Sequence, residues 1–279
     1  MSYKSILTVL TSKSGATSLL DQAVALADRH DAHLDVLCLG IDRAQIGYYY
    51  GGADATILQD AVDRATAESK EIEEAAIQRL TGESIRWSTE SDLAQLGDIG
   101  RRIGWQARFA DLVVLPKPYG DDKGVELEPV TESVLFEGRA SALILPGDVA
   151  APVAPKSVML GWNETPEALA AIRAALPMLK TAEAVHIVII DPPSHGPDRS
   201  DPGGMLANWL SRHGVSAEIE VVAKTLPRIS DLISRHALDI SADLVVMGAY
   251  GHSRFRQAIL GGATRNMMEG TTLPIFMAH

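Results

Sequence analysis

The chain contains 279 residues, of which 46% are hydrophobic and 22% are charged, and its net charge at pH 7 is −11. This length suits one large or two ordinary domains, and because no run of about 18 apolar residues occurs, we expect no transmembrane helix. Nucleic acids and anionic membranes are polyanions, so the acidic balance argues against both as partners. The segment MSYKSILTVL lacks the features of a signal peptide, and we expect a cytoplasmic protein.

The first half alternates short apolar runs with stretches of helical spacing. Strands are expected near residues 4–10, 33–39, 83–88, 111–116 and 141–146. Helices are expected between them, and the second, at roughly 54–80, is much longer than the others. Cys38 lies in an apolar run, where we expect a small core residue rather than a nucleophile. The prolines and small residues of 146–156 indicate a linker.

The second half repeats this order of strands and helices. The expected strands are 156–162, 185–190, 217–223, 243–248 and the terminal LPIFMA, and the expected helices are 165–180, 203–213, 228–238 and 261–270. Thr165 is a candidate N-cap, and Pro166 is tolerated in the first turn that follows. Continuous apolar strands that alternate with helices indicate parallel sheets covered on both faces. Such sheets bind ligands beyond the carboxyl ends of their strands.

An internal repeat relates the two halves. Residues 110–145 align with 242–277 without gaps, with seven identities in 36 positions, five of them consecutive in ADLVV. KSILTVL near the start also resembles KSVMLGW just after the linker. Chance similarity between strands of like composition is the alternative, but the equivalent order of both matches favours duplication. We therefore expect two domains, residues 1–150 and residues 151–279.

A glycine-rich segment joins the strand at 243–248 to the helix that follows it. Its candidate ligand-binding residues are Gly248, Gly251, His252, Ser253, Gly261, Gly262, Ala263 and Thr264. Glycines let the backbone approach an anion closely, and a helix start favours negative charge through its N–H groups and its dipole. Such a loop can also serve only to turn the chain, and it matches neither G-x4-G-K-[ST] nor G-x-G-x-x-G. Residues 151–279 hold 11 basic and 12 acidic side chains, whereas residues 1–150 hold 14 and 24, so the second half is the better host for an anion.

The spacing G-x2-G-x9-G, after an apolar strand and before a helix and a terminal strand, resembles the signature of the universal stress protein family. The resemblance covers essentially the whole chain as two tandem domains. It implies an α/β fold of the adenine-nucleotide α-hydrolase type, with two doubly wound parallel five-stranded sheets of order 3-2-1-4-5. It further implies dimers formed through the last strand, ATP binding through the glycine loop in many members, and roles in stress tolerance and signalling more than in catalysis.

Three positions bear on whether this chain binds ATP. Gly262 stands where the ATP-binding members carry Ser or Thr, so the side-chain donor to phosphate is lost. Asn163 stands where they usually carry Asp, and it can form a hydrogen bond without a charge. Ile189 matches a position that packs against adenine in the family, although without the family it reads as a core strand residue.

The first half lacks the glycine loop. At the three glycine positions it carries Pro116, Tyr119 and Pro129. Proline supplies no N–H group, and the acidic segment KPYGDDKGVELEP would repel phosphate. We therefore expect no nucleotide in the first domain, which would act as a structural partner in place of the second subunit of a dimer. A homodimer of the whole chain stays open.

Three further features are candidates of lower rank. His30 and His33, with the aspartates beside them, suggest a metal site, but their spacing matches no strong zinc pattern, so we expect only a polar turn and no metal. His195 lies on a loop rich in proline and glycine, which would be either a lid or a disordered connection. The tyrosines of 48–50 would line a pocket, line an interface or simply pack.

These observations lead to one expected function and two alternatives. No G-x-S-x-G, H-E-x-x-H or supported Cys/His pair occurs, so we do not expect a dedicated enzyme, while slow ATP hydrolysis near His252 stays open. We expect a stress-response or signalling module that binds ATP or another adenine nucleotide in its second domain. The alternatives are a dimerising scaffold that binds no nucleotide and an adenylating enzyme, against which the first strands lack a glycine/serine phosphate loop.

Overall fold

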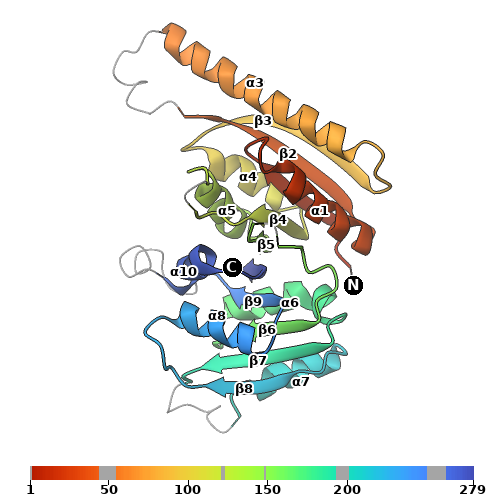
Figure 1. The fold of residues 1–279 in the computed structure, drawn as a ribbon, viewed down its shortest axis with the longest axis vertical. Coiled ribbons are helices and arrows are strands. Elements are labelled where there is room, and N and C mark those ends of the chain that lie inside the picture. Colours follow the sequence, from red (N-terminus) through yellow and green to blue (C-terminus); the bar gives the residue numbers. More distant parts are fainter. Residues whose placement is uncertain (1, 44–54, 121–122, 148, 193–200, 250–261) are drawn as a thin grey trace. The chain divides into compact units, whose positions relative to one another are not determined.

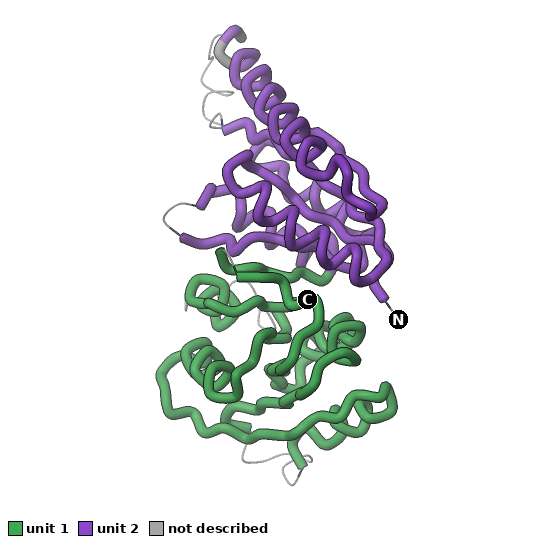
Figure 2. The backbone as a smooth tube through the Cα atoms, turned by 45° about the vertical axis from the view of Figure 1, so that its right-hand side comes forward, with its two compact units in different colours: residues 1, 141–279 green, residues 2–140 purple. Residues whose placement is uncertain are grey.

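The computed structural model describes residues 2–43, 55–120, 123–147, 149–192, 201–249 and 262–279. The chain divides into two compact units, which we call the N-terminal unit, Ser2–Ala140, and the C-terminal unit, Ser141–His279 (Figure 2). Among the described residues, no helix combines the length and the apolar character that crossing a membrane requires.

The N-terminal unit alternates strands and helices along the chain (Figure 1). Its elements are β1 Ser5–Leu10, α1 Ala16–His30, β2 His33–Asp42, α3 Ala55–Leu80, β3 Arg86–Gln95, α4 Ile99–Ala107, β4 Leu112–Pro116 and α5 Leu127–Phe136. The strands lie in the order β3-β2-β1-β4, and all their pairings are parallel. Helix α3 lies along β2 and β3, α1 contacts α3, and α4 contacts α5.

The C-terminal unit repeats this plan and completes it. Its elements are β5 Ala142–Leu145, β6 Ser157–Gly161, α6 Pro166–Leu179, β7 Ala184–Ile190, α7 Gly204–Arg212, β8 Glu218–Val222, α8 Ile229–Asp239, β9 Leu244–Gly248, α10 Ala263–Gly270 and β10 Ile275–Ala278. The parallel strands lie in the order β8-β7-β6-β9-β10. This is the expected order 3-2-1-4-5.

Strand β5 departs from the expected arrangement of two separate five-stranded sheets. It pairs antiparallel with β10, with Ile144 opposite Ile275 and Leu143 opposite Phe276. Every residue of both strands is buried, so the pairing shields two short apolar strands and covers the edge of β10. The terminal strands of the two sequence halves therefore lie side by side, like the last strands in the dimers that the family resemblance implies, and the C-terminal compact unit begins at Ser141.

The repeated ADLVV segment has the same structural task in both units. The carboxylate of Asp111 accepts hydrogen bonds from the backbone N–H groups of Lys4 and Ser5, at 2.6 and 3.1 Å. The carboxylate of Asp243 accepts the equivalent bonds from Lys156 and Ser157, at 2.8 and 3.1 Å. Each aspartate thus fixes the start of the central strand against its neighbour, which explains why both copies carry it.

Strand β3 differs most from expectation, since it runs over Arg86–Gln95 rather than 83–88. It pairs with β2 along all ten of its residues. Most residues of this edge strand are exposed or half-exposed, and its stretch STESD is polar. A prediction based on apolar runs therefore misses most of the strand.

Cys38 on β2 is fully buried, and burial, with a smaller contribution from Glu73, raises the pKa of its thiol to about 12, consistent with an inert core residue.

Candidate functional site at the carboxyl edge of the C-terminal sheet

Helix α6 begins at this edge with a built N-cap. Thr165 accepts a hydrogen bond from the backbone N–H of Ala168 at 3.2 Å, and Pro166 occupies the first helical turn, which confirms the expected cap. The exposed Asn163 side chain accepts hydrogen bonds from the Thr165 hydroxyl at 2.9 Å and from the Thr165 N–H at 3.4 Å. The side-chain oxygen of Asn163 therefore orients Thr165, the N-cap of α6.

Gly248, the last residue of β9, lies against this first turn of α6. A Cβ atom at Gly248 would lie 2.5 Å from the backbone N of Ala168 and 2.8 Å from the backbone C of Glu167. Real Cβ atoms essentially never approach backbone so closely. Glycine at this position is thus required by the packing of α6 on β9, whether or not a ligand binds.

Helix α10 begins at Ala263, after Gly262 as its N-cap. Gly262 has φ −62° and ψ 149°, an extended conformation that serine adopts readily at an N-cap. The Ala263 side chain is exposed, whereas Thr264 is only 4% exposed. The Ala263 position therefore offers a surface at the positive end of the helix dipole.

Ile189 lies on β7 and is 4% exposed. Its Cδ1 atom would lie 3.0 Å from a Cβ atom at Gly203, the residue that precedes α7. The Ile189 side chain is therefore covered by the start of α7. The remaining predicted residues of the glycine loop, Gly251, His252, Ser253 and Gly261, lie outside the described residues, as do His195 and the tyrosines of 48–50.

The corresponding region of the N-terminal unit contains a buried carboxylate instead of glycines. Pro116 ends β4, and the Tyr119 hydroxyl donates to Glu128 at 2.9 Å. Glu126, the N-cap of α5, is 3% exposed, with one carboxylate oxygen 3.5 Å from the Arg43 guanidinium. The start of α5 thus carries a carboxylate where an anionic ligand would otherwise be favoured.

The histidines near the turn between α1 and β2 contact different partners. His30 is buried edge-to-face against Tyr3, with ring centroids 4.7 Å apart. Asp31 pairs with Lys4 at 3.0 Å and Arg86 at 2.7 Å, and His33 lies 3.1 Å from the Ser88 hydroxyl. Within the described residues, the cluster with metal-binding geometry lies elsewhere, in the C-terminal unit.

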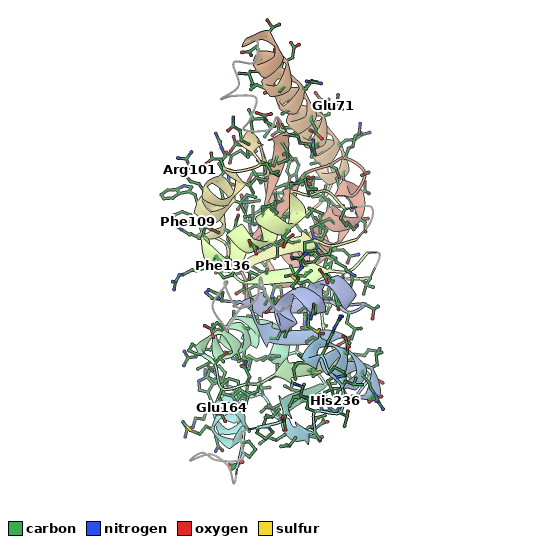
Figure 3. All side chains as sticks on the ribbon, turned by 90° about the vertical axis from the view of Figure 1, so that its left-hand side faces the viewer. Glu71, Arg101, Phe109, Phe136, Glu164 and His236 are labelled. Atoms are coloured by element: carbon green, nitrogen blue, oxygen red, sulfur yellow. The ribbon has the colours of Figure 1, made fainter. Side chains whose placement is uncertain are left out.

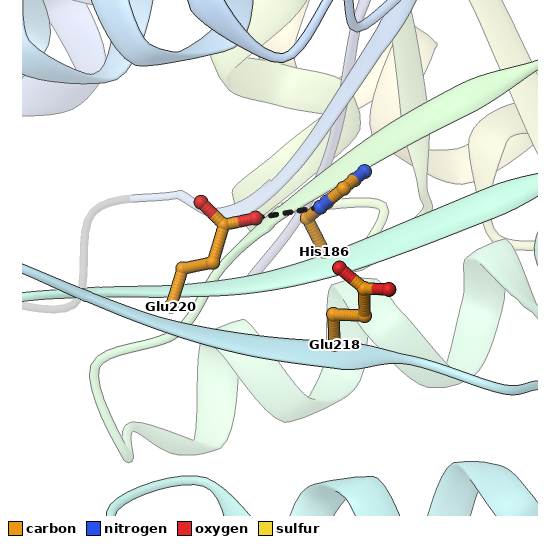
Figure 4. A group of neighbouring side chains, drawn as sticks. All are labelled: His186, Glu218 and Glu220. Carbon is orange, nitrogen blue, oxygen red and sulfur yellow. Dashed lines mark hydrogen bonds and ion pairs between the residues drawn. The ribbon is translucent and has the colours of Figure 1, made fainter.

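That cluster contains His186, Glu218 and Glu220, and the sequence analysis missed it (Figure 4). The signal was present in the alternation of β8, where Glu218 and Glu220 project to one face, beside His186 of β7. The expected order 3-2-1-4-5 places these two strands side by side, but the register that sets His186 opposite Glu218 comes only from the structure.

An exposed aromatic pair marks the surface of α4 in the N-terminal unit. Trp105 and Phe109 are 62% and 72% exposed and pack edge-to-face, with centroids 5.9 Å apart. Arg101 and Phe109 lie on the same side of this unit in Figure 3. A hollow of about 530 Å³ is lined by Gly97, Asp98, Gly100, Arg101, Trp105, Arg108 and Glu137. Nothing in the described part of the chain indicates what covers it.

Comparison with known proteins identifies the C-terminal half. The sequence model of the universal stress protein family matches residues 155–279. The chain carries a universal stress protein domain. The universal stress protein Slr1230 of Synechocystis sp. is 29% identical over 91 residues, which make up 33% of this chain and 31% of that relative. The match therefore spans less than a third of the relative's length.

Solved structures extend the likeness of fold to both halves. A universal stress protein from Archaeoglobus fulgidus superposes with a TM-score of 0.73 at 15% identity, covering 98% of this chain and 95% of that chain. A universal stress protein from Pseudomonas aeruginosa gives a TM-score of 0.57 at 17% identity, covering 99% and 93%. At these identities the superpositions establish the universal stress protein fold and nothing finer.

Proposed function

We propose that the universal stress protein domain binds an adenine nucleotide, with phosphate at the start of α10 and the nucleoside near Asn163. Binding would serve a stress-response or signalling role rather than a dedicated catalytic one. The family match over residues 155–279 carries the proposal, because the resemblance implies ATP binding through the loop between β9 and α10. The exposed Ala263 at the positive end of the α10 dipole supports it.

The same geometry supports weak binding. Gly262 provides no hydroxyl to phosphate, and the Asn163 side-chain oxygen already accepts two hydrogen bonds from Thr165. A hydrogen bond to a charged group contributes about 1.5–3 kcal/mol, and about 1.4 kcal/mol corresponds to a factor of ten in affinity. We therefore expect an affinity at least roughly tenfold below that of members with serine and aspartate at these positions.

Isothermal titration of the full-length protein with ATP tests the proposal through Ala263→Asp. A carboxylate at this exposed first helical position would repel phosphate, while it is compatible with the helix dipole and leaves the core untouched. We expect binding to fall at least tenfold with an unchanged unfolding midpoint. Ala223→Asp, which adds the same charge at an exposed alanine after β8, is the matched control and should bind like the parent. Equal affinities for the two variants would contradict the proposal.

Gly262→Ser provides a test in the opposite direction. Its extended backbone accepts serine, and the new hydroxyl would stand at the N-cap of α10. We expect ATP binding to tighten by about tenfold, as one added hydrogen bond to a charged phosphate predicts. An unchanged affinity, in a parent that binds ATP, would place the phosphate elsewhere.

A dimerising scaffold without nucleotide is the second candidate, and one observation favours it. Gly248, Asn163 and Ile189 each have a packing or capping role in the described structure that needs no ligand. Absence of adenine nucleotide from the purified protein by mass spectrometry, together with no heat of binding for ATP, ADP or AMP, would establish this alternative.

A further inference from the structure

The C-terminal unit contains a cluster of imidazole and carboxylate groups on β7 and the edge strand β8 of its sheet. His186 of β7 lies directly opposite Glu218 of β8, and Glu220 projects from β8 to the same face two residues later. One ligand atom from each of the three lies within 4.8 Å of the others (Figure 4). The cluster lies on strands at the β8 side of the sheet, and none of its members belongs to the proposed nucleotide site.

A second histidine orients the cluster from the covering helix. Glu220 lies 2.6 Å from His186 Nδ1 through one oxygen and 2.7 Å from His236 Nε2 of α8 through the other. The side chains of His186, Glu220 and His236 are 15%, 28% and 17% exposed. They are thus mostly withdrawn from water yet reachable by an ion.

The charge of the cluster favours a divalent cation. Two carboxylates lie together here, and among the described residues no lysine or arginine pairs with either of them. Glu218 itself forms no hydrogen bond or ion pair with another described side chain, although it lies beside Glu220. Like charges at this distance repel each other unless a cation lies between them.

The N-terminal unit shows that the fold does not require such a cluster. By strand pairing, Asp35, Ser88 and Glu90 occupy the positions of His186, Glu218 and Glu220. There Ser88 donates to Asp35 at 2.7 Å, and Gln106 donates to Glu90 at 3.0 Å. That face is satisfied by these hydrogen bonds and by the His33 imidazole, 3.4 Å from Asp35, whereas the C-terminal unit has one imidazole and two carboxylates at the same three positions.

We propose that His186, Glu218 and Glu220 bind a zinc ion, with His236 as the positioning residue that holds Glu220 through its second oxygen. Nitrogen and carboxylate ligands suit zinc and neighbouring transition metals better than magnesium or calcium. Zinc–ligand distances of about 2.0–2.2 Å place tetrahedral ligand atoms roughly 3.3 Å apart, so small side-chain rotations close the site. The ion takes the place of the hydrogen that Glu220 and His186 share, and water supplies the fourth ligand.

Zinc titration of the full-length, chelator-treated protein tests this site, with Glu218→Gln as the decisive variant. Because Glu218 has no hydrogen-bond or ion-pair partner among the described side chains and is repelled by Glu220, its loss should not lower the metal-free unfolding midpoint. We expect one zinc ion fewer per chain, or at least tenfold weaker binding, in Glu218→Gln and in His186→Gln. For the positioning residue, His236→Gln should weaken binding by roughly 10–100-fold without changing the number of ions. Millimolar magnesium should not compete.

The controls are His213→Gln and Glu183→Gln, which remove a histidine and an exposed glutamate elsewhere in the same unit and should bind zinc like the parent. Cobalt(II) absorption supplies a readout independent of stability, since a tetrahedral site gives intense visible bands that Glu218→Gln should lose. The site is overturned if the parent binds no zinc, if Glu218→Gln matches the parent in affinity and stoichiometry, or if only the histidine variants lose binding.

Discussion

At the scale of single residues, His30 shows how burial in the N-terminal unit changes the chemistry of a side chain. Its ring is 8% exposed against Tyr3, and its Nε2 atom has no hydrogen-bond partner among the described residues. Burial, with smaller contributions from the charges of Arg29 and Lys4, holds the pKa of His30 below its ordinary value. The folded state therefore binds a proton less readily than the unfolded state does.

This depressed pKa makes stability sensitive to acid. The contribution of neutral His30 is fully present above the unfolded pKa of about 6.5 and is lost as the pH falls from there toward the folded pKa, by at most about 1.4 kcal/mol per pH unit. His30→Phe keeps a ring against Tyr3 and removes the titration. We expect urea unfolding of this variant to show a smaller loss of free energy between pH 7 and pH 5. Parallel pH curves for variant and parent would contradict the assignment.

Residue identity alone predicted the cap at Thr165 and the buried Cys38, because each rests on local chemistry, whereas the departure at Gly262 rests on the family resemblance and stays a prediction. It did not predict why Gly248 is glycine, since that depends on how closely α6 approaches β9. Nor did it find His186, Glu218 and Glu220, whose proximity requires the pairing of β7 with β8. Pairing between strands is a long-range contact, and no spacing along the chain reports it.

At the scale of elements, Asp111 and Asp243 form equivalent hydrogen bonds in the two units, so their substitution should affect stability in similar ways. Asp111→Asn and Asp243→Asn each weaken two charge-assisted hydrogen bonds to the start of the central strand. We expect each to lower the free energy of unfolding by about 1–3 kcal/mol, since asparagine keeps a neutral acceptor but loses the charge. Urea unfolding followed by circular dichroism measures both.

Asp239→Asn is the control for these variants. Its carboxylate is 64% exposed and lies 4.0 Å from Arg235, so its removal should change the free energy of unfolding by less than about 0.5 kcal/mol. A large loss for one of the two repeated aspartates and none for the other would show that the copies no longer share this task.

Most elements were predictable because apolar runs and helical spacing report burial directly. The exceptions have physical causes: β3 is a polar edge strand, and β5 pairs antiparallel with β10, a contact between strands that are far apart in the sequence. The family resemblance predicted the order of the strands. It also implied contacts through the last strand, but not the antiparallel register of β5 with β10.

At the scale of the whole molecule, two units of one plan differ in their chemistry. The C-terminal unit has glycines and an exposed helix start, whereas the N-terminal unit holds the buried Glu126 beside Arg43 at the start of α5. A phosphate there would meet a carboxylate that is already in place. The two units thus share a scaffold while their edges differ in chemistry, which leads us to expect one nucleotide per chain rather than two.

The Arg43 and Glu126 pair tests this division in the full-length protein. Arg43→Gln leaves the Glu126 carboxylate buried without its guanidinium partner, so we expect the free energy of unfolding to fall by about 1–3 kcal/mol. Adding Glu126→Gln removes the buried charge and should recover most of that loss, because a neutral amide costs less to bury than a carboxylate does. Urea unfolding measures the recovery of stability.

ATP titration of the same proteins tests whether the start of α5 takes part in nucleotide binding. The number of nucleotides per chain and their affinity should stay unchanged in both variants. A second bound nucleotide in the parent, or an altered affinity in Arg43→Gln, would show that the N-terminal edge takes part in binding.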